Sequence, residues 1–104
     1  MTARANPLRG EACLEISGTK HLLRPSFSAL VCAEEELGSL FALVERAGNG
    51  ELRLAEMATL FWHCLERQEA VSREQMGEAI LTLGLANCTA PLKVILGEIL
   101  RGRT

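Results

Sequence analysis

Aromatic residues are scarce in this chain of 104 amino acids, which holds no tyrosine, one tryptophan and three phenylalanines. Proteins that bind single-stranded nucleic acid stack the bases on several aromatic side chains, so a platform of that kind is not predicted. An excess of charge of one sign is missing too, because 11 basic residues face 13 acidic ones and the net charge is −2. Binding to nucleic acid through phosphate neutralisation is therefore not expected.

Long apolar runs are also absent. No segment approaches the roughly 20 consecutive apolar residues that a membrane-spanning helix needs. The N-terminal residues MTARANPLRGE lack the apolar stretch of a secretory signal. These two observations predict a cytoplasmic protein that has no membrane partner.

Closely spaced cysteine pairs are the third feature that the sequence lacks. The four cysteines, Cys13, Cys32, Cys64 and Cys88, form no C-x-x-C pair, so neither a zinc ribbon nor a redox motif is predicted. Each lies among apolar neighbours, where a free cysteine behaves as a small hydrophobic residue. We expect buried, reduced thiols, no metal site and no cofactor.

What is present fits a globular domain, with 48% hydrophobic and 23% charged residues. The length suits one domain over residues 1–104. Polar and apolar residues alternate over residues 11–16, a turn glycine follows, and a short second strand ends before Pro25. This pattern predicts a β-hairpin over about residues 11–24. Two strands alone are marginal in water, so the hairpin must pack on helices.

Helical periodicity continues over about residues 27–102. Residues 54–67 are apolar over most of the helix surface, which predicts a central helix that the other elements pack against. The expected N-caps are serines, at position 26 or 28, at 39 and at 72. Pro91 suits the first turn of the last helix. The predicted fold is mainly α, with the hairpin packed on a compact bundle of about five helices.

One segment resembles a calcium-binding loop of the EF-hand type. Residues 45–56 place Asn49 at loop position five, Gly50 at position six and Glu56 at position twelve. Positions three and nine, however, hold alanine and arginine, and calcium needs six or more oxygen ligands. The simpler interpretation is a glycine-rich turn between two helices, and a degenerate EF-hand-like binding module stays as an alternative.

No arrangement of residues typical of an enzyme stands out. His63 and Cys64 are adjacent on a helix and point about 100° apart, so they cannot both face one site. The glycines fit no phosphate-binding loop, and no Gly-x-Ser-x-Gly motif is present. A thiol enzyme that pairs Cys13 or Cys88 with a distant histidine is a further alternative. We expect a protein without catalytic residues, in which His63 lies partly exposed on the surface.

Motifs in the N-terminal third resemble those of a known family. Residues 6–11 (NPLRGE) lead into the first strand, residues 22–30 (LLRPSFSAL) connect the hairpin to a helix, and Glu34 and Gly38 follow. Their order is similar to that in the tail assembly chaperones of gene transfer agents, which are phage-like particles of α-proteobacteria, and of related siphophages. The family is sometimes labelled a gene transfer agent tail tube protein. The resemblance covers about residues 6–85.

The resemblance implies a binding function without catalysis. Members of this family are expected to coat the long tape measure protein of the tail and to keep its amphipathic helix in solution until the tube polymerises around it. The implied partners are the tape measure protein and tail tube subunits, and a second copy of the chain is a further candidate. A structural component of the tail tube or of tail completion is the alternative, although tube subunits are normally β-barrels with long strands.

Surplus apolar surface on the predicted helices indicates where a partner binds. The last helix is strongly amphipathic, and periodicity favours a place in its own core over docking on another chain. The residues that we expect to contact a partner are large apolar side chains on three helices: Phe41, Trp62, Ile95, Leu96 and Ile99.

Overall fold

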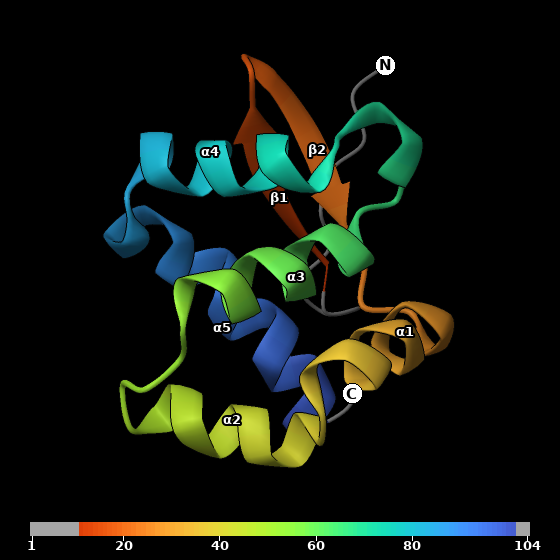
Figure 1. Ribbon diagram of the computed structural model, residues 1–104, viewed down its shortest axis with the longest axis vertical. Coiled ribbons are helices and arrows are strands. Elements are labelled where there is room, and N and C mark those ends of the chain that lie inside the picture. The colour runs from red at the N-terminus through yellow and green to blue at the C-terminus, as the bar shows by residue number, and fades with distance from the viewer. Residues whose placement is uncertain (1–10, 102–104) are drawn as a thin grey trace.

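The hairpin predicted at the start of the chain is present in the computed structural model, which describes residues 11–101. Strands β1 (Ala12–Ile16) and β2 (Thr19–Leu23) pair antiparallel (Figure 1). The turn residues Ser17 and Gly18 have φ angles of 52° and 81°. Positive φ at both central residues of a two-residue turn matches the twist of the strands, so this turn determines their register.

Helices make up most of the remaining structure. Within residues 11–101 they are α1 (Phe27–Leu37), α2 (Leu40–Gly48), α3 (Leu54–Cys64), the short 3-10 helix η2 (Gln68–Ala70), α4 (Arg73–Leu83) and α5 (Leu85–Arg101). The predicted class, a mainly helical fold with an N-terminal hairpin packed on the helices, is confirmed.

Three serines begin helices, as their positions in the sequence predict. Ser26, Ser39 and Ser72 each accept a hydrogen bond from the backbone amide three residues further on, over 3.1–3.2 Å. At α4 the Gln75 side chain also accepts a bond from the Ser72 amide over 2.8 Å, which completes a capping box. These local bonds fix where α1, α2 and α4 start.

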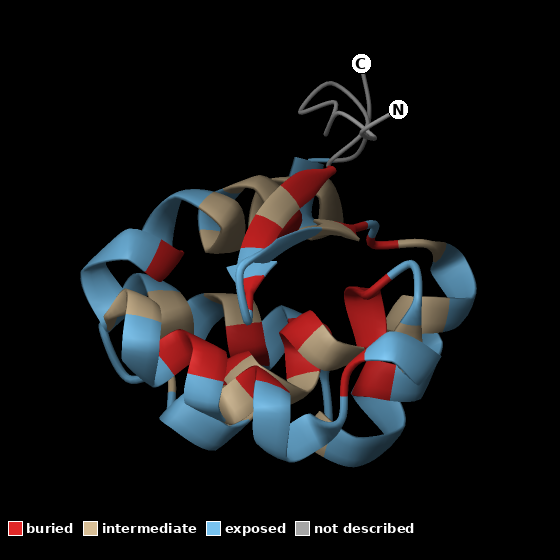
Figure 2. Cartoon of the chain, turned by 90° about the horizontal axis from the view of Figure 1, so that it is seen from above, coloured by how far each residue is buried: buried red, intermediate tan, exposed pale blue. Residues whose placement is uncertain are grey.

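Two helices share the centre of the core. α3 packs on α1 and α4, whereas α5 packs on α4, β1 and α2. Phe61 of α3 and Ile95 of α5 are completely buried, and the buried residues line the inner faces of the elements in Figure 2. The expectation that every element packs against residues 54–67 is therefore wrong in part, because α5 covers β1 and α2.

The central helix is shorter than predicted because its C-terminal end pairs with the hairpin. α3 stops at Cys64, and Leu65 is extended, with φ −59° and ψ 131°. Leu65 forms a β-bridge with Leu23, and the Arg24 amide donates to the Cys64 carbonyl over 2.6 Å. This pairing between distant segments overrides the local helical preference of residues 65–67.

The last helix begins earlier than predicted, at Leu85 instead of near Pro91. Gly84, with φ 88°, separates α4 from α5, which meet at a bend of 118°. Cys88 lies before the proline and is fully buried on the same side of the helix as Ile95. Burial of Cys88 favours the additional turns, although Pro91 within the helix removes one backbone hydrogen bond and its ring crowds the Asn87 carbonyl.

Candidate partner-binding surface

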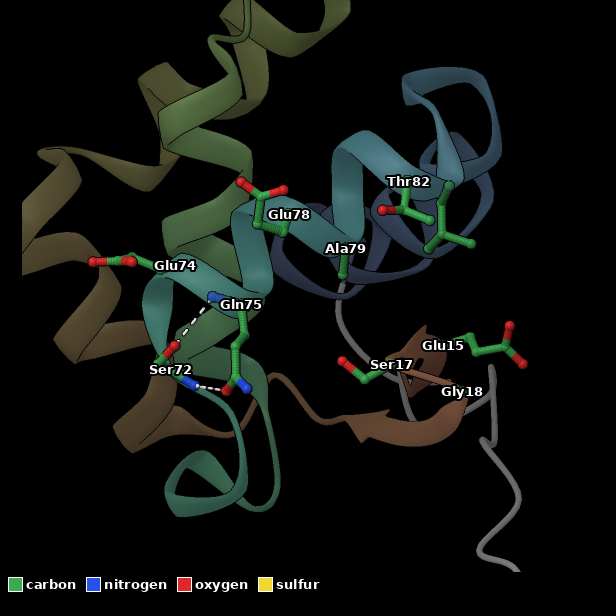
Figure 3. A pocket seen from close by; sticks show the side chains of 10 residues that line it. Glu15, Ser17, Gly18, Ser72, Glu74, Gln75, Glu78, Ala79 and Thr82 are labelled. Atoms are coloured by element: carbon green, nitrogen blue, oxygen red, sulfur yellow. Dashed lines mark hydrogen bonds between the residues drawn. The ribbon is translucent and has the colours of Figure 1, made fainter.

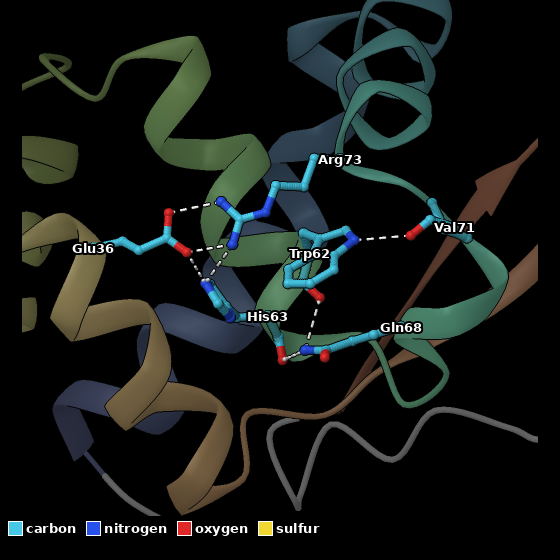
Figure 4. A network of polar contacts seen from close by, with 6 residues as sticks. All are labelled: Glu36, Trp62, His63, Gln68, Val71 and Arg73. Atoms are coloured by element: carbon cyan, nitrogen blue, oxygen red, sulfur yellow. Dashed lines mark hydrogen bonds and ion pairs between the residues drawn. The ribbon is translucent and has the colours of Figure 1, made fainter.

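Trp62, predicted to contact a partner, is held by its own chain. Its indole Nε1 donates a hydrogen bond to the Val71 carbonyl over 2.8 Å, and the Arg73 guanidinium lies 4.5 Å from the ring centroid (Figure 4). The side chain is half-buried and packs against the core. Its structural role is to tie the segment between α3 and α4 to α3.

The predicted contacts on α5 mostly complete the core of the chain itself. Ile95 is fully buried, and Leu96 and Ile99 are half-buried against the core. The prediction that Ile95 contacts a partner is incompatible with this fold, because the surrounding side chains exclude it from the surface. Leu96 and Ile99 retain only part of their surface for such a contact.

Phe41 is the predicted contact whose side chain is most exposed, at 66%. It lies at the start of α2, next to the buried Leu40, and points away from the core. A more exposed side chain lies on α1, where Phe27 is 85% exposed, and Val31, one turn later, is 38% exposed. Residues four apart lie on the same side of a helix, so these two side chains form one apolar face.

An apolar residue beside an N-cap favours a place in the core, but Phe27 at the start of α1 lies outside it. Pro25 is buried there instead, and the Ser26 cap directs the following residue outward. On the inner side of the helix, Ala33 is fully buried and Leu30 and Leu37 pack against the core. The sequence does carry a sign of this surface, because apolar residues cover two sides of α1 and packing on one core requires only one apolar side.

A polar cluster of Glu36, His63 and Arg73 joins α1, α3 and the start of α4 (Figure 4). The Glu36 carboxylate accepts hydrogen bonds from both guanidinium Nη atoms of Arg73, and the bond from Nη1 is 2.7 Å long. It also lies 2.7 Å from His63 Nε2. Because the carboxylate is an acceptor, this nitrogen carries the hydrogen. His63 is only 7% exposed, so its predicted place on the surface is wrong.

This cluster has a structural role in the described part of the chain. The Arg73 guanidinium, and to a lesser extent His63, hold the pKa of the Glu36 carboxyl at about 2, well below its ordinary value of 4.5. Each reactive group therefore already has a partner within the fold. The cluster connects helices that are far apart in the sequence, at the edge of the core.

Acid should weaken this connection. Because the folded pKa of Glu36 lies below 4.5, the ion pair contributes to stability above about pH 4.5 and is lost as the pH falls toward about 2. We expect the difference in urea midpoint between the wild-type protein and Glu36→Gln to shrink over this range. The exposed variant Glu35→Gln is the control. A difference that is constant from pH 7 to pH 2 would contradict this assignment.

The calcium-loop alternative finds no support in the geometry of residues 45–56. The Glu56 carboxylate accepts hydrogen bonds from Arg46 Nη1, over 2.6 Å, and from the Arg53 amide, over 2.9 Å. These bonds lower the pKa of Glu56, with Arg46 making the largest contribution. Glu56 thus caps α3 and pairs with α2. Nowhere in residues 11–101 do three or more His, Cys, Asp or Glu side chains gather to hold a metal ion.

The cysteines divide into two kinds. Cys64 and Cys88 are buried, as predicted, and burial raises the pKa of the Cys64 thiol to about 12. Cys13 is half-buried, and Cys32 is exposed on α1, so the expectation that all four are buried is wrong. Cys32 directly follows Val31 on the outer side of the helix.

A groove lies between α4 and the β1–β2 turn, with a volume of about 630 Å³ (Figure 3). Residues from two distant parts of the sequence line it: Glu15, Ser17, Gly18, Ser72, Glu74, Gln75, Glu78, Ala79, Thr82 and Leu83. We call it the α4–turn groove. The sequence gives no sign of this groove, because its two walls are more than fifty residues apart in the chain.

The sequence of the chain matches one protein family over most of its length. The family described as phage tail tube protein, GTA-gp10, matches residues 9–102. The chain belongs to this family. No curated protein and no solved structure matches it.

Membership of the GTA-gp10 family confirms the expected link to the tails of phages and gene transfer agents. It also places the partners of this protein among tail proteins in general. In the part of this family member that the structure describes, no single helix is long and apolar enough to cross a membrane. The bent pair of α4 and α5 has the length and the apolar composition of a span only when the two helices are taken together.

Proposed function

We propose that this GTA-gp10 family protein is a tail assembly chaperone that binds the tape measure protein and catalyses no reaction. The observation that carries the proposal is the apolar face of Phe27 and Val31 on α1, on a chain of the phage tail family. Neither side chain belongs to the hydrophobic core or to the residues packed against it. A tape measure segment is a partner of matching chemistry, because it is long, helical and apolar on one side.

The exposed side chains are large enough to support such binding. Burying a phenylalanine that was exposed contributes about 1.5–3 kcal/mol. Phe27 and Phe41, at the starts of α1 and α2, each offer an anchor of this size to an apolar helix. Anchors of this kind are typical of helix-in-groove recognition, in which an apolar helix face supplies most of the affinity.

The family description favours a second candidate function, that of a tail tube component. The described residues supply one pair of five-residue strands. Alternate side chains of β1 face the core, and the end of β2 pairs with Leu65. A tube role would require helices to form the contacts between subunits. Electron microscopy of polymerised tails tests this candidate, since a tube component stays in the finished particle and a chaperone leaves it.

Co-expression with the tape measure protein tests the chaperone function. We expect the wild-type chain to raise the soluble fraction of the tape measure protein and to co-purify with it. The double variant Phe27→Ser/Val31→Ser should reduce both at least several-fold, because it removes the apolar face of α1. The matched control is Leu85→Ser, which removes a side chain that is 54% exposed at the junction of α4 and α5.

Two outcomes would contradict the proposal. One is a tape measure protein that stays equally insoluble with and without the wild-type chain. The other is an equal loss of binding in the double variant and in Leu85→Ser, which would indicate general stickiness of exposed apolar residues instead of a defined surface.

A further inference from the structure

The α4–turn groove has an apolar floor and an acidic rim. Ala79 is buried, Leu83 is half-buried, and Ala79 points from α4 toward the β1–β2 turn (Figure 3). The carboxylates of Glu74 and Glu78 extend outward on the helix side, and that of Glu15 on the hairpin side. The three carboxylates therefore lie at the outer edges of the groove and point away from its apolar floor.

These rim carboxylates are available to a partner. Across residues 11–101, no ion pair involves Glu15, Glu74 or Glu78. Lys20 lies opposite Glu15 in the strand register but is not among the residues that line the groove. The lining contains three acidic and no basic residues, so the groove favours a cationic partner.

The dimensions of the groove match a short helix. Along α4 the lining runs from Ser72 to Leu83, a distance of about 16 Å or three helical turns at the usual rise per residue. The three carboxylates spread apart along the rim instead of converging on one point (Figure 3). An arrangement of this kind suits positive charges distributed along both flanks of a helix, and it does not suit a single metal ion.

We propose that the α4–turn groove receives an amphipathic helical segment of a partner protein, about three turns long, whose apolar stripe is flanked by lysine or arginine. The apolar stripe covers Ala79 and Leu83, and the flanking cations lie beside Glu15, Glu74 and Glu78. The identity of the natural partner as a tail protein rests on the proposed function, whereas the chemistry of the segment rests on the groove alone.

This binding site is separate from the apolar face of Phe27 and Val31. The groove is formed by α4 and the hairpin turn, and α1 and α4 lie on different sides of α3 (Figure 1). A long helical partner that alternates apolar and basic segments can therefore contact both places on one molecule, or one place on each of two molecules.

The test uses a synthetic leucine–lysine amphipathic helix of about four turns, labelled with fluorescein, and fluorescence anisotropy with the full chain. We expect saturable binding that weakens as salt rises. The counterpart peptide with glutamate in place of lysine should bind at least tenfold more weakly. Glu74→Gln/Glu78→Gln should weaken binding of the lysine peptide about four- to twenty-five-fold, since an exposed charge pair is typically worth about two- to fivefold in affinity.

The matched control, Glu35→Gln/Glu45→Gln, removes the same charge from exposed positions on α1 and α2 and should change affinity by less than about twofold. Thr82→Arg offers a second way to block the groove, because it places a large cation at an exposed position in its wall. Equal losses in the two glutamine double variants, or equal binding of the two peptides, would overturn the proposal.

The same experiment separates this inference from the chaperone function. Phe27→Ser/Val31→Ser should bind the lysine peptide as the wild-type chain does. Loss of tape measure binding in a protein whose peptide binding obeys the predicted pattern would count against the chaperone function alone. Tape measure binding by a protein whose groove shows no preference for the lysine peptide would count against the groove alone.

Discussion

Replacing Phe61 with alanine should lower the free energy of unfolding by about 3–5 kcal/mol. Phe61 lies on α3 and is the largest of the side chains that are completely buried. Its removal forfeits the transfer free energy of the ring and leaves a cavity between helices that cannot close around it fully. Urea denaturation followed by circular dichroism measures the change, as a lower midpoint at an unchanged slope.

The chain provides its own controls for this substitution. Phe27→Ala and Phe41→Ala remove the same ring from positions that are 85% and 66% exposed, and each should change stability by no more than about 0.5 kcal/mol. Domains of this kind are stable by only about 5–15 kcal/mol, so Phe61→Leu serves as a milder variant if the alanine variant does not fold. A Phe61→Ala protein as stable as Phe41→Ala would show that α3 does not lie in the core.

Thiol labelling should separate Cys32 from Cys64 by a factor on the order of a thousand or more. Cys32 is exposed on α1 and reacts in the folded state. Cys64 is buried, and its pKa of about 12 leaves little thiolate at neutral pH. Its labelling requires unfolding of the region around α3, which costs a large part of the total stability. Mass spectrometry of peptides after timed exposure to a maleimide reports each rate.

The labelling experiment also connects the two predictions. Phe61→Ala should accelerate the labelling of Cys64 strongly while leaving that of Cys32 unchanged, because Cys64, unlike Cys32, depends on opening of the core. Cys88, which is also buried, should follow Cys64. Rates for Cys32 and Cys64 within tenfold of each other in the wild-type protein would contradict the packing of α3 described above.

The parts of the fold that sequence predicted well depend on contacts between near neighbours. The Ser17-Gly18 turn, the serine caps and the alternation of β1 each involve residues only a few positions apart. The errors arose where distant segments meet. Residues 65–67 are not helical, because Leu65 and Glu66 pair with β2, and the segment before Pro91 is helical because Cys88 packs in the core.

The binding surface was less predictable than the fold for the same reason. Periodicity identifies apolar residues but does not decide which of two apolar sides of a helix faces inward. Of the residues named as partner contacts, Phe41 is exposed on α2 and Ile95 is buried, whereas Phe27, which was not named, is the most exposed of the large apolar side chains. The α4–turn groove could not be predicted from the sequence, because its prediction requires knowing that the hairpin turn and α4 lie next to each other.

The hydrogen bond between the Arg24 amide and the Cys64 carbonyl joins the start and the end of a long segment of the chain. It brings together the two ends of the segment that contains α1, α2 and α3. Phe27, Val31 and Phe41 all lie within that segment, and the whole α4–turn groove lies outside it. Substitutions at the apolar face of the enclosed segment therefore leave every residue that lines the α4–turn groove unchanged.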